Sequence, residues 1–97
     1  MNIERFHNEL AMRLGYERIV KNKRLNIAVE ESDDPWVMLT IDGCDRIHFK
    51  ASEELEDVES LKNLEMRDEI KQISAAVHEA YLRSTNNSLF VYNSLQR

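Results

Sequence analysis

Apolar residues recur at intervals of three and four positions at the start of the chain, and polar residues fill the other side. Asn2 precedes this pattern and is suited to cap a helix, because its side chain can accept a backbone amide of the first turn. Gly15 follows it, where a left-handed residue often ends a helix. A helix is therefore predicted over residues 3–14, with an apolar stripe formed by Ile3, Phe6, Leu10 and Leu14.

Strict alternation of apolar and polar residues begins at Leu25 and continues through Ile27 and Val29. This period of two predicts a half-buried strand. Residues 16–20 either pair with that strand or are irregular, and the local pattern leaves both alternatives open. The segment Ser32–Pro35 predicts a turn, because proline fixes its own φ and aspartate bonds nearby backbone amides.

A second hairpin is predicted around Asp42-Gly43, a strong turn signal. A two-residue loop would mix apolar and polar side chains on each face of the pair. A three-residue loop separates them, so that one face carries Val37, Leu39, Ile47 and Phe49. The other face then carries Met38, Thr40, Arg46 and His48. The odd loop is favoured, because a slip of one residue would expose the apolar set to water.

The last main element is predicted to begin at Ser52, with Glu53 and Glu54 in a first helical turn. A stripe over Leu55, Val58 and Leu61 falters near Asn63. A cleaner stripe follows, made of Met66, Ile70, Ile73, Val77 and Tyr81. The pattern indicates either one bent helix or two helices, ended by Asn86-Asn87. Residues Leu89–Tyr92 form a short apolar run, interpreted as a strand, a final helical turn or a partner contact.

Together these elements predict an α+β fold. It consists of an N-terminal helix, a three-stranded antiparallel meander and a C-terminal helix or helix pair, packed on one sheet face because that face needs a cover. The chain of 97 residues is expected to form a single domain over 1–97. One cysteine, no signal-peptide pattern and no long apolar run indicate a cytoplasmic protein.

Charge is distributed unevenly along the chain. Residues 30–59 carry eleven acidic and two basic residues, a local charge of −9, whereas the whole chain has −5. A fold that gathers this segment on one side has a negative face, which attracts basic partners and repels nucleic acid. The simpler interpretation is a solvated surface that maintains solubility. The functional interpretation predicts a partner-binding set made of Glu30, Glu31, Asp33, Asp34, Trp36, Glu53, Glu54, Glu56, Asp57 and Glu59.

Trp36 joins this set because side chains alternate between the two faces of a strand, which places Trp36 on the same face as Met38 and away from the Val37 face. Exposed Trp and Met are enriched in protein interfaces. The alternative is that Trp36 covers the back or the edge of the sheet.

The layout and charge of the chain resemble those of small acidic inhibitors carried by bacteriophages, including some anti-CRISPR proteins. The resemblance rests on a short helix opening Met1-Asn2-Ile3, an antiparallel meander and an acidic helix. It covers most of the chain and carries no residue-level motif. It implies an inhibitor that binds the basic surface of a nucleic-acid-handling protein by imitating DNA phosphates.

Other candidate chemistry is weak. Arg18, Lys21, Lys23 and Arg24 form a small basic patch with little aromatic interleaving, which is weak evidence for nucleic-acid binding. Asp42, Asp45 and His48 lack a further ligand at metal-binding spacing. His7 and His78 have no metal-ligand partner at hand, and Cys44 has only His48 as a nearby base. We therefore expect no catalysis, no metal and no cofactor.

A second hypothesis treats the protein as a structural homodimer. The stripe Met66–Tyr81 holds more apolar surface than a three-stranded sheet needs, so part of it could bury against a second copy. The two hypotheses differ in the surface that binds, and they predict different oligomeric states.

Overall fold

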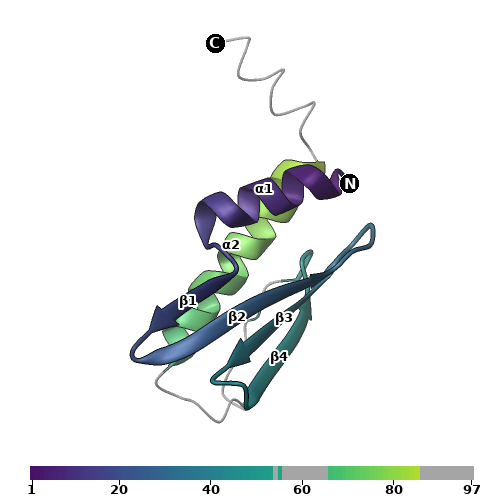
Figure 1. Ribbon diagram of the computed structural model, residues 1–97. Helices are drawn as coiled ribbons and strands as arrows, with labels where there is room; N and C mark the ends of the chain where they lie inside the picture. Colours follow the sequence, from purple (N-terminus) through teal and green to yellow (C-terminus); the bar gives the residue numbers. More distant parts are fainter. Residues whose placement is uncertain (54, 56–65, 86–97) are drawn as a thin grey trace.

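The computed structural model describes residues 1–53, 55 and 66–85. Its elements follow the order α1 (Ile3–Arg13), β1 (Glu17–Val20), β2 (Lys23–Glu30), β3 (Trp36–Ile41), β4 (Asp45–Lys50) and α2 (Arg67–Thr85). The four strands form one antiparallel sheet in chain order, and both helices lie on the same side of it (Figure 1). The predicted two-layer α+β arrangement is confirmed.

The first helix begins and ends as its sequence predicts. The side chain of Asn2 accepts a hydrogen bond from the backbone amide of Arg5 at 3.0 Å, which satisfies one of the free amides of the first turn. Gly15 has a φ of +71°, and its amide donates to the carbonyl of Leu10 at 3.2 Å. Only glycine adopts this left-handed conformation without steric cost, so α1 ends there.

The sheet has four strands rather than the predicted three, because Glu17–Val20 pairs with β2. The turn between them consists of Lys21 and Asn22, both with positive φ, as a two-residue hairpin turn with the twist of the strands requires. In the middle of β1, the apolar residue faces solvent and the charged residue faces the core side, the reverse of the usual arrangement. Ile19 faces solvent with 71% of its surface exposed, while Arg18 faces the core side with Leu25.

The register of the second hairpin follows the prediction. Asp42, Gly43 and Cys44 connect the strands, and Leu39 pairs with Ile47 while Val37 pairs with Phe49. These four apolar residues are buried. Met38, Thr40, Arg46 and His48 occupy the opposite face, so the three-residue loop is confirmed.

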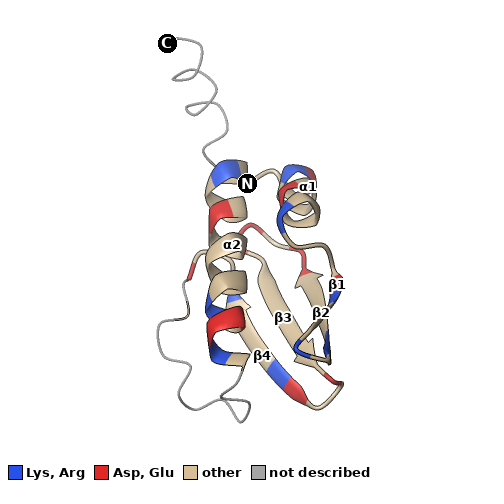
Figure 2. Ribbon diagram, turned by 90° about the vertical axis from the view of Figure 1, so that its left-hand side faces the viewer, with Lys and Arg blue, Asp and Glu red and all other residues tan. Residues whose placement is uncertain are grey.

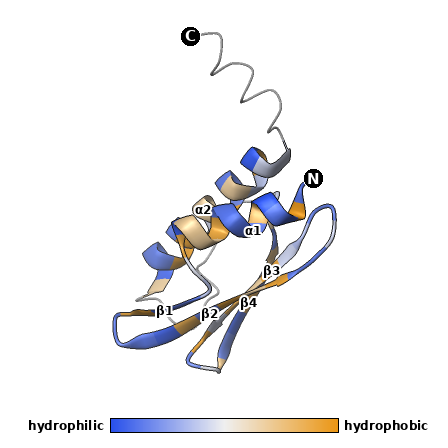
Figure 3. Ribbon diagram, turned by 45° about the horizontal axis from the view of Figure 1, so that its top comes forward, coloured by the Kyte–Doolittle hydropathy of each residue, from blue (hydrophilic) through white to orange (hydrophobic). Residues whose placement is uncertain are grey.

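The core lies between the helices and one face of the sheet (Figure 3). Phe6 and Leu10 of α1 contact a cluster formed by the inward-facing residues of β2, β3 and β4. From α2 come residues spaced by three and four, which places them on one helical face: Ile70, Ile73, Val77 and Ala80. Met66, directly before α2, continues the same spacing and is also buried.

The prediction of a helix beginning at Ser52 is wrong for the described residues around it. Ser52 lies in a turn, and neither Glu53 nor Leu55 is helical. The hydroxyl of Ser52 donates to Asp34 instead of capping a helix. The amide of Leu55 donates to the hydroxyl of Ser74 at 3.0 Å, which holds this segment against α2. Val58, Leu61, Asn63, the pair Asn86-Asn87 and the run Leu89–Tyr92 lie outside the described residues.

The stripe on α2 serves the protein's own core. Met66, Ile70, Ile73 and Val77 are almost completely buried, and Tyr81 packs against the same cluster. The buried sheet residues of this cluster come from β2, β3 and β4, and β1 adds only the partly buried Val20. Most of the described stripe is therefore occupied within the protomer, and dimerisation through it stays a prediction.

Candidate binding surfaces

The connection between β2 and β3 is fixed to the segment that follows β4. Asp34 accepts a hydrogen bond from the backbone amide of Ser52 at 3.1 Å and another from its hydroxyl at 2.6 Å. The amide of Ala51 also donates to the carbonyl of Pro35 at 2.8 Å. The acidic β2–β3 connection is thereby held beside Ser52 and Glu53, which are distant from it in the sequence. Figure 2 shows carboxylate residues along this connection.

The structure gathers three exposed carboxylates at this end of the molecule, and we call them the acidic end: Glu31, Asp33 and Glu53. Asp34 belongs to the same end, but its carboxylate is occupied by Ser52. Its role is to position the other acids. The remaining predicted acids of the second stretch lie outside the described residues: Glu54, Glu56, Asp57 and Glu59.

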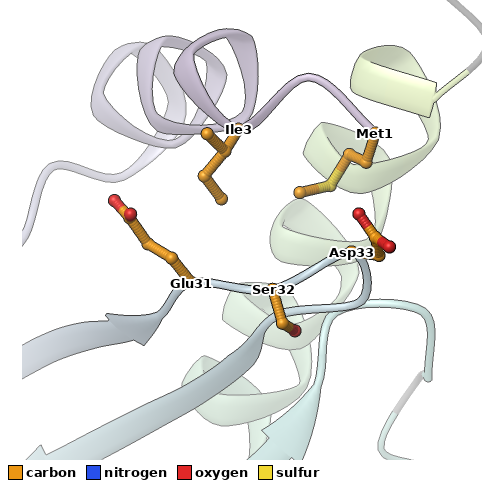
Figure 4. Close-up of a pocket in the computed structure, with 5 residues that line it drawn as sticks. All are labelled: Met1, Ile3, Glu31, Ser32 and Asp33. Carbon is orange, nitrogen blue, oxygen red and sulfur yellow. The ribbon is translucent and has the colours of Figure 1, made fainter.

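An open hollow of about 510 Å³ adjoins the acidic end and is lined by Met1, Ile3, Glu31, Ser32 and Asp33. Figure 4 shows the carboxylates of Glu31 and Asp33 directed toward the start of α1, while Ser32 points away from it. The hollow thus combines two apolar side chains with two acidic ones. Such a lining suits a lysine or arginine side chain, which has an aliphatic stem and a cationic head.

Glu31 is positioned by a chain of hydrogen bonds from two other segments. Its carboxylate lies 3.0 Å from Nε2 of His7, and Nδ1 of His7 lies 2.6 Å from the hydroxyl of Tyr16. Burial raises the pKa of the Tyr16 phenol above its ordinary value of 10.0, so the phenol is protonated and able to donate at neutral pH. The sequence analysis missed this cluster, because its members come from three separate segments and share no local spacing.

Two members of the predicted partner-binding set lie on the opposite side of the sheet from Glu31. Successive side chains of a strand alternate between faces, so Glu30 and Trp36 point away from the helices. Trp36 stacks on His48, with ring centroids 4.4 Å apart and an angle of 32° between the planes. The ammonium of Lys50 lies 5.5 Å from the centre of the Trp36 ring. Trp36 therefore has a cationic neighbour on this face and lies apart from the acidic end.

The residues considered for metal binding are used in other ways. Asp42 accepts the backbone amide of Arg24 at 2.9 Å, and His48 is stacked on Trp36. Over residues 1–53, 55 and 66–85, no cluster of three His, Cys, Asp or Glu side chains could hold a metal ion. Cys44 is an exposed thiol in the β3–β4 turn.

One member of the small basic patch has an acidic partner: the guanidinium of Arg24 pairs with Glu17 at 3.5 Å.

No protein-family model matches the chain, and no curated protein or solved structure matches it either. None of the helices in the described part of the chain is long and apolar enough to cross a bilayer.

Proposed function

We propose that the protein is a small binding module whose acidic end engages a basic surface on another protein. The observation that carries this proposal is the bond pair between Asp34 and Ser52. It joins the acidic β2–β3 connection to the acidic stretch that begins at Glu53. This contact supports the proposal because it brings Glu53 beside the acids of the β2–β3 connection. Asp42 and Asp45 lie at the β3–β4 turn and do not belong to this end.

The chemistry of the hollow describes the partner. A lysine or arginine side chain can lay its stem on Met1 and Ile3 and place its cationic head between Glu31 and Asp33. Individual exposed ion pairs contribute only about 0.2–1 kcal/mol. Useful affinity therefore requires several cations on the partner. Rows of lysine and arginine are typical of proteins that bind nucleic acid. A partner of that class would be inhibited, because the acidic end would compete with nucleic acid for the same basic surface.

Charge variants test the proposal. The probe is a synthetic peptide of alternating arginine and alanine, titrated into the protein in a calorimeter. The variant Asp33→Lys/Glu53→Lys should bind about tenfold more weakly, because each exchange replaces attraction by repulsion. The matched control is Asp68→Lys/Glu69→Lys, which makes the same change of net charge at the start of α2 and should alter the affinity less than about twofold.

Salt dependence provides a second readout. Exposed charges are screened over about 10 Å at 0.1 M ionic strength, so binding should weaken between low and physiological salt. Equal losses in the two double variants would show that the peptide responds only to net charge. That result, or binding that salt does not affect, would overturn the proposal.

A further inference from the structure

The sheet face that points away from the helices carries a group of apolar and aromatic side chains among polar ones. An antiparallel sheet with one solvated face usually presents polar residues there. Here the described helices cover only the opposite face (Figure 1). The outward side chains include Ile19, Ala28, Trp36 and Met38, and a hollow of about 150 Å³ lies between Trp36, Met38 and His48. We call this side the open face.

Strand pairing arranges the open face in rows. Trp36 pairs with Glu30 on β2 and with Lys50 on β4, so the first row reads Glu30, Trp36, Lys50. The second row is Ala28, Met38, His48, and the third is Asn26, Thr40, Arg46. The central column, on β3, has no charged residue. In the first row an acid and a base stand at equal positions on either side of that column.

We propose that the open face is a homodimer interface and that its two-fold axis runs along β3. A rotation about this axis places β2 of one protomer over β4 of the other. Glu30 then lies opposite the partner subunit's Lys50, and Lys50 lies opposite the partner subunit's Glu30. Such a self-complementary patch is the requirement for an isologous interface. Trp36 and Met38 lie on the axis, where apolar and aromatic side chains form the centre of an interface.

The alternative two-fold axis, perpendicular to the strands, fits the charges poorly. It would place β4 over β4, with Arg46 opposite the partner subunit's Lys50. Like charges facing each other in an interface are strongly unfavourable. The rows therefore select the axis along β3. Sheets that pack face to face cross at about 30°. The long side chains of Glu30 and Lys50 can still reach each other across sheets that cross at this angle.

The test is sedimentation equilibrium of charge-exchange variants. The wild-type protein should have a mass that rises with concentration from 11.4 kDa toward the dimer. Glu30→Lys and Lys50→Glu should each weaken the dimer by about tenfold or more, because each creates two like-charge contacts. A mixture of the two variants should restore association. In the mixed pair, one protomer carries two bases and the other two acids, so both contacts are complementary.

The mixing step distinguishes an interface from a contact within one protomer. A contact within one chain would be repaired by the double variant Glu30→Lys/Lys50→Glu and not by mixing. The variant Asp33→Lys/Glu53→Lys should remain dimeric, so failure of this inference is separable from failure of the proposed function. The single tryptophan of the chain gives a second signal. Its emission should shift to shorter wavelength as the dimer forms and Trp36 loses contact with water.

Three results would overturn the inference. The first is a concentration-independent mass near 11.4 kDa. The second is a mixture of the two variants that stays monomeric. The third is a monomer whose Trp36 fluorescence is quenched by oligothymidine, which would assign the open face to single-stranded nucleic acid instead.

Discussion

Asp34 and Ser52 are joined by two hydrogen bonds, from the backbone amide and from the hydroxyl of the serine to the two oxygens of one carboxylate. Hydrogen bonds to charged groups contribute more than neutral ones. Asp34→Ala should therefore lower the free energy of unfolding by about 2 kcal/mol. Ser52→Ala, the matched control, keeps the backbone bond and should cost less. Urea denaturation measures both, and equal losses would show that the backbone bond contributes nothing.

The faces of the second hairpin can be tested by truncation. Leu39 is fully buried and pairs with Ile47, so Leu39→Ala should cost on the order of 2–5 kcal/mol of stability. Arg46 is exposed on the open face, and Arg46→Ala should stay within about 0.5 kcal/mol. The two variants are compared by chemical denaturation at a protein concentration low enough to keep them monomeric. A larger loss for Arg46→Ala would mean that the faces are reversed.

The cap of α1 gives a third prediction. The side chain of Asn2 accepts a hydrogen bond from the backbone amide of Arg5, and the backbone amide of Asn2 donates to the carbonyl of Ser84 at 3.3 Å. Asn2→Ala removes only the side-chain bond and should destabilise the protein by about 1 kcal/mol. Asn2→Ser can still accept the amide and should retain most of the stability. The thermal midpoints of the two variants give the comparison, and an unchanged midpoint for Asn2→Ala contradicts the assigned role.

Tyr16 predicts how stability responds to alkaline pH. Burial raises the pKa of its phenol above the ordinary value of 10.0, so the folded state holds this proton more tightly than the unfolded state. The resulting contribution to stability is complete below pH 10 and is lost as the pH rises through the folded-state pKa. The free energy of unfolding should fall more steeply above about pH 10 in the wild type than in Tyr16→Phe. Parallel curves for the two proteins over that range would contradict the prediction.

Parity arguments succeeded where both faces of an element had a clear chemical character. Leu39 and Ile47 could be assigned to one face, because a one-residue shift of register would have exposed an apolar set. The same reasoning could not decide β1, since Ile19 is exposed and Arg18 faces inward. β1 has only four residues, and its apolar and polar positions do not match its buried and exposed faces. The local sequence therefore could not predict which of its side chains face the core.

Ser52 shows the other limit of sequence reasoning. Ser-Glu-Glu is a common start of a helix, because serine can accept a backbone amide and the acids favour the helix N-terminus. Serine side chains also bond to other partners when tertiary structure provides them. Here the partner is Asp34, 18 residues away in the sequence. The bridge from His7 to Tyr16 and Glu31 was likewise invisible, because only folding brings these residues together.

The order of the strands also determines how the chain assembles. Each strand pairs with its neighbour in the sequence, so the sheet can grow from one hairpin to the next through short loops, which favours fast folding. The contact between α1 and α2 joins distant parts of the chain and closes the core. We expect core truncations in β2 and β3 to slow folding, and those between the helices mainly to accelerate unfolding. We therefore expect the two helices to separate early when the protein unfolds.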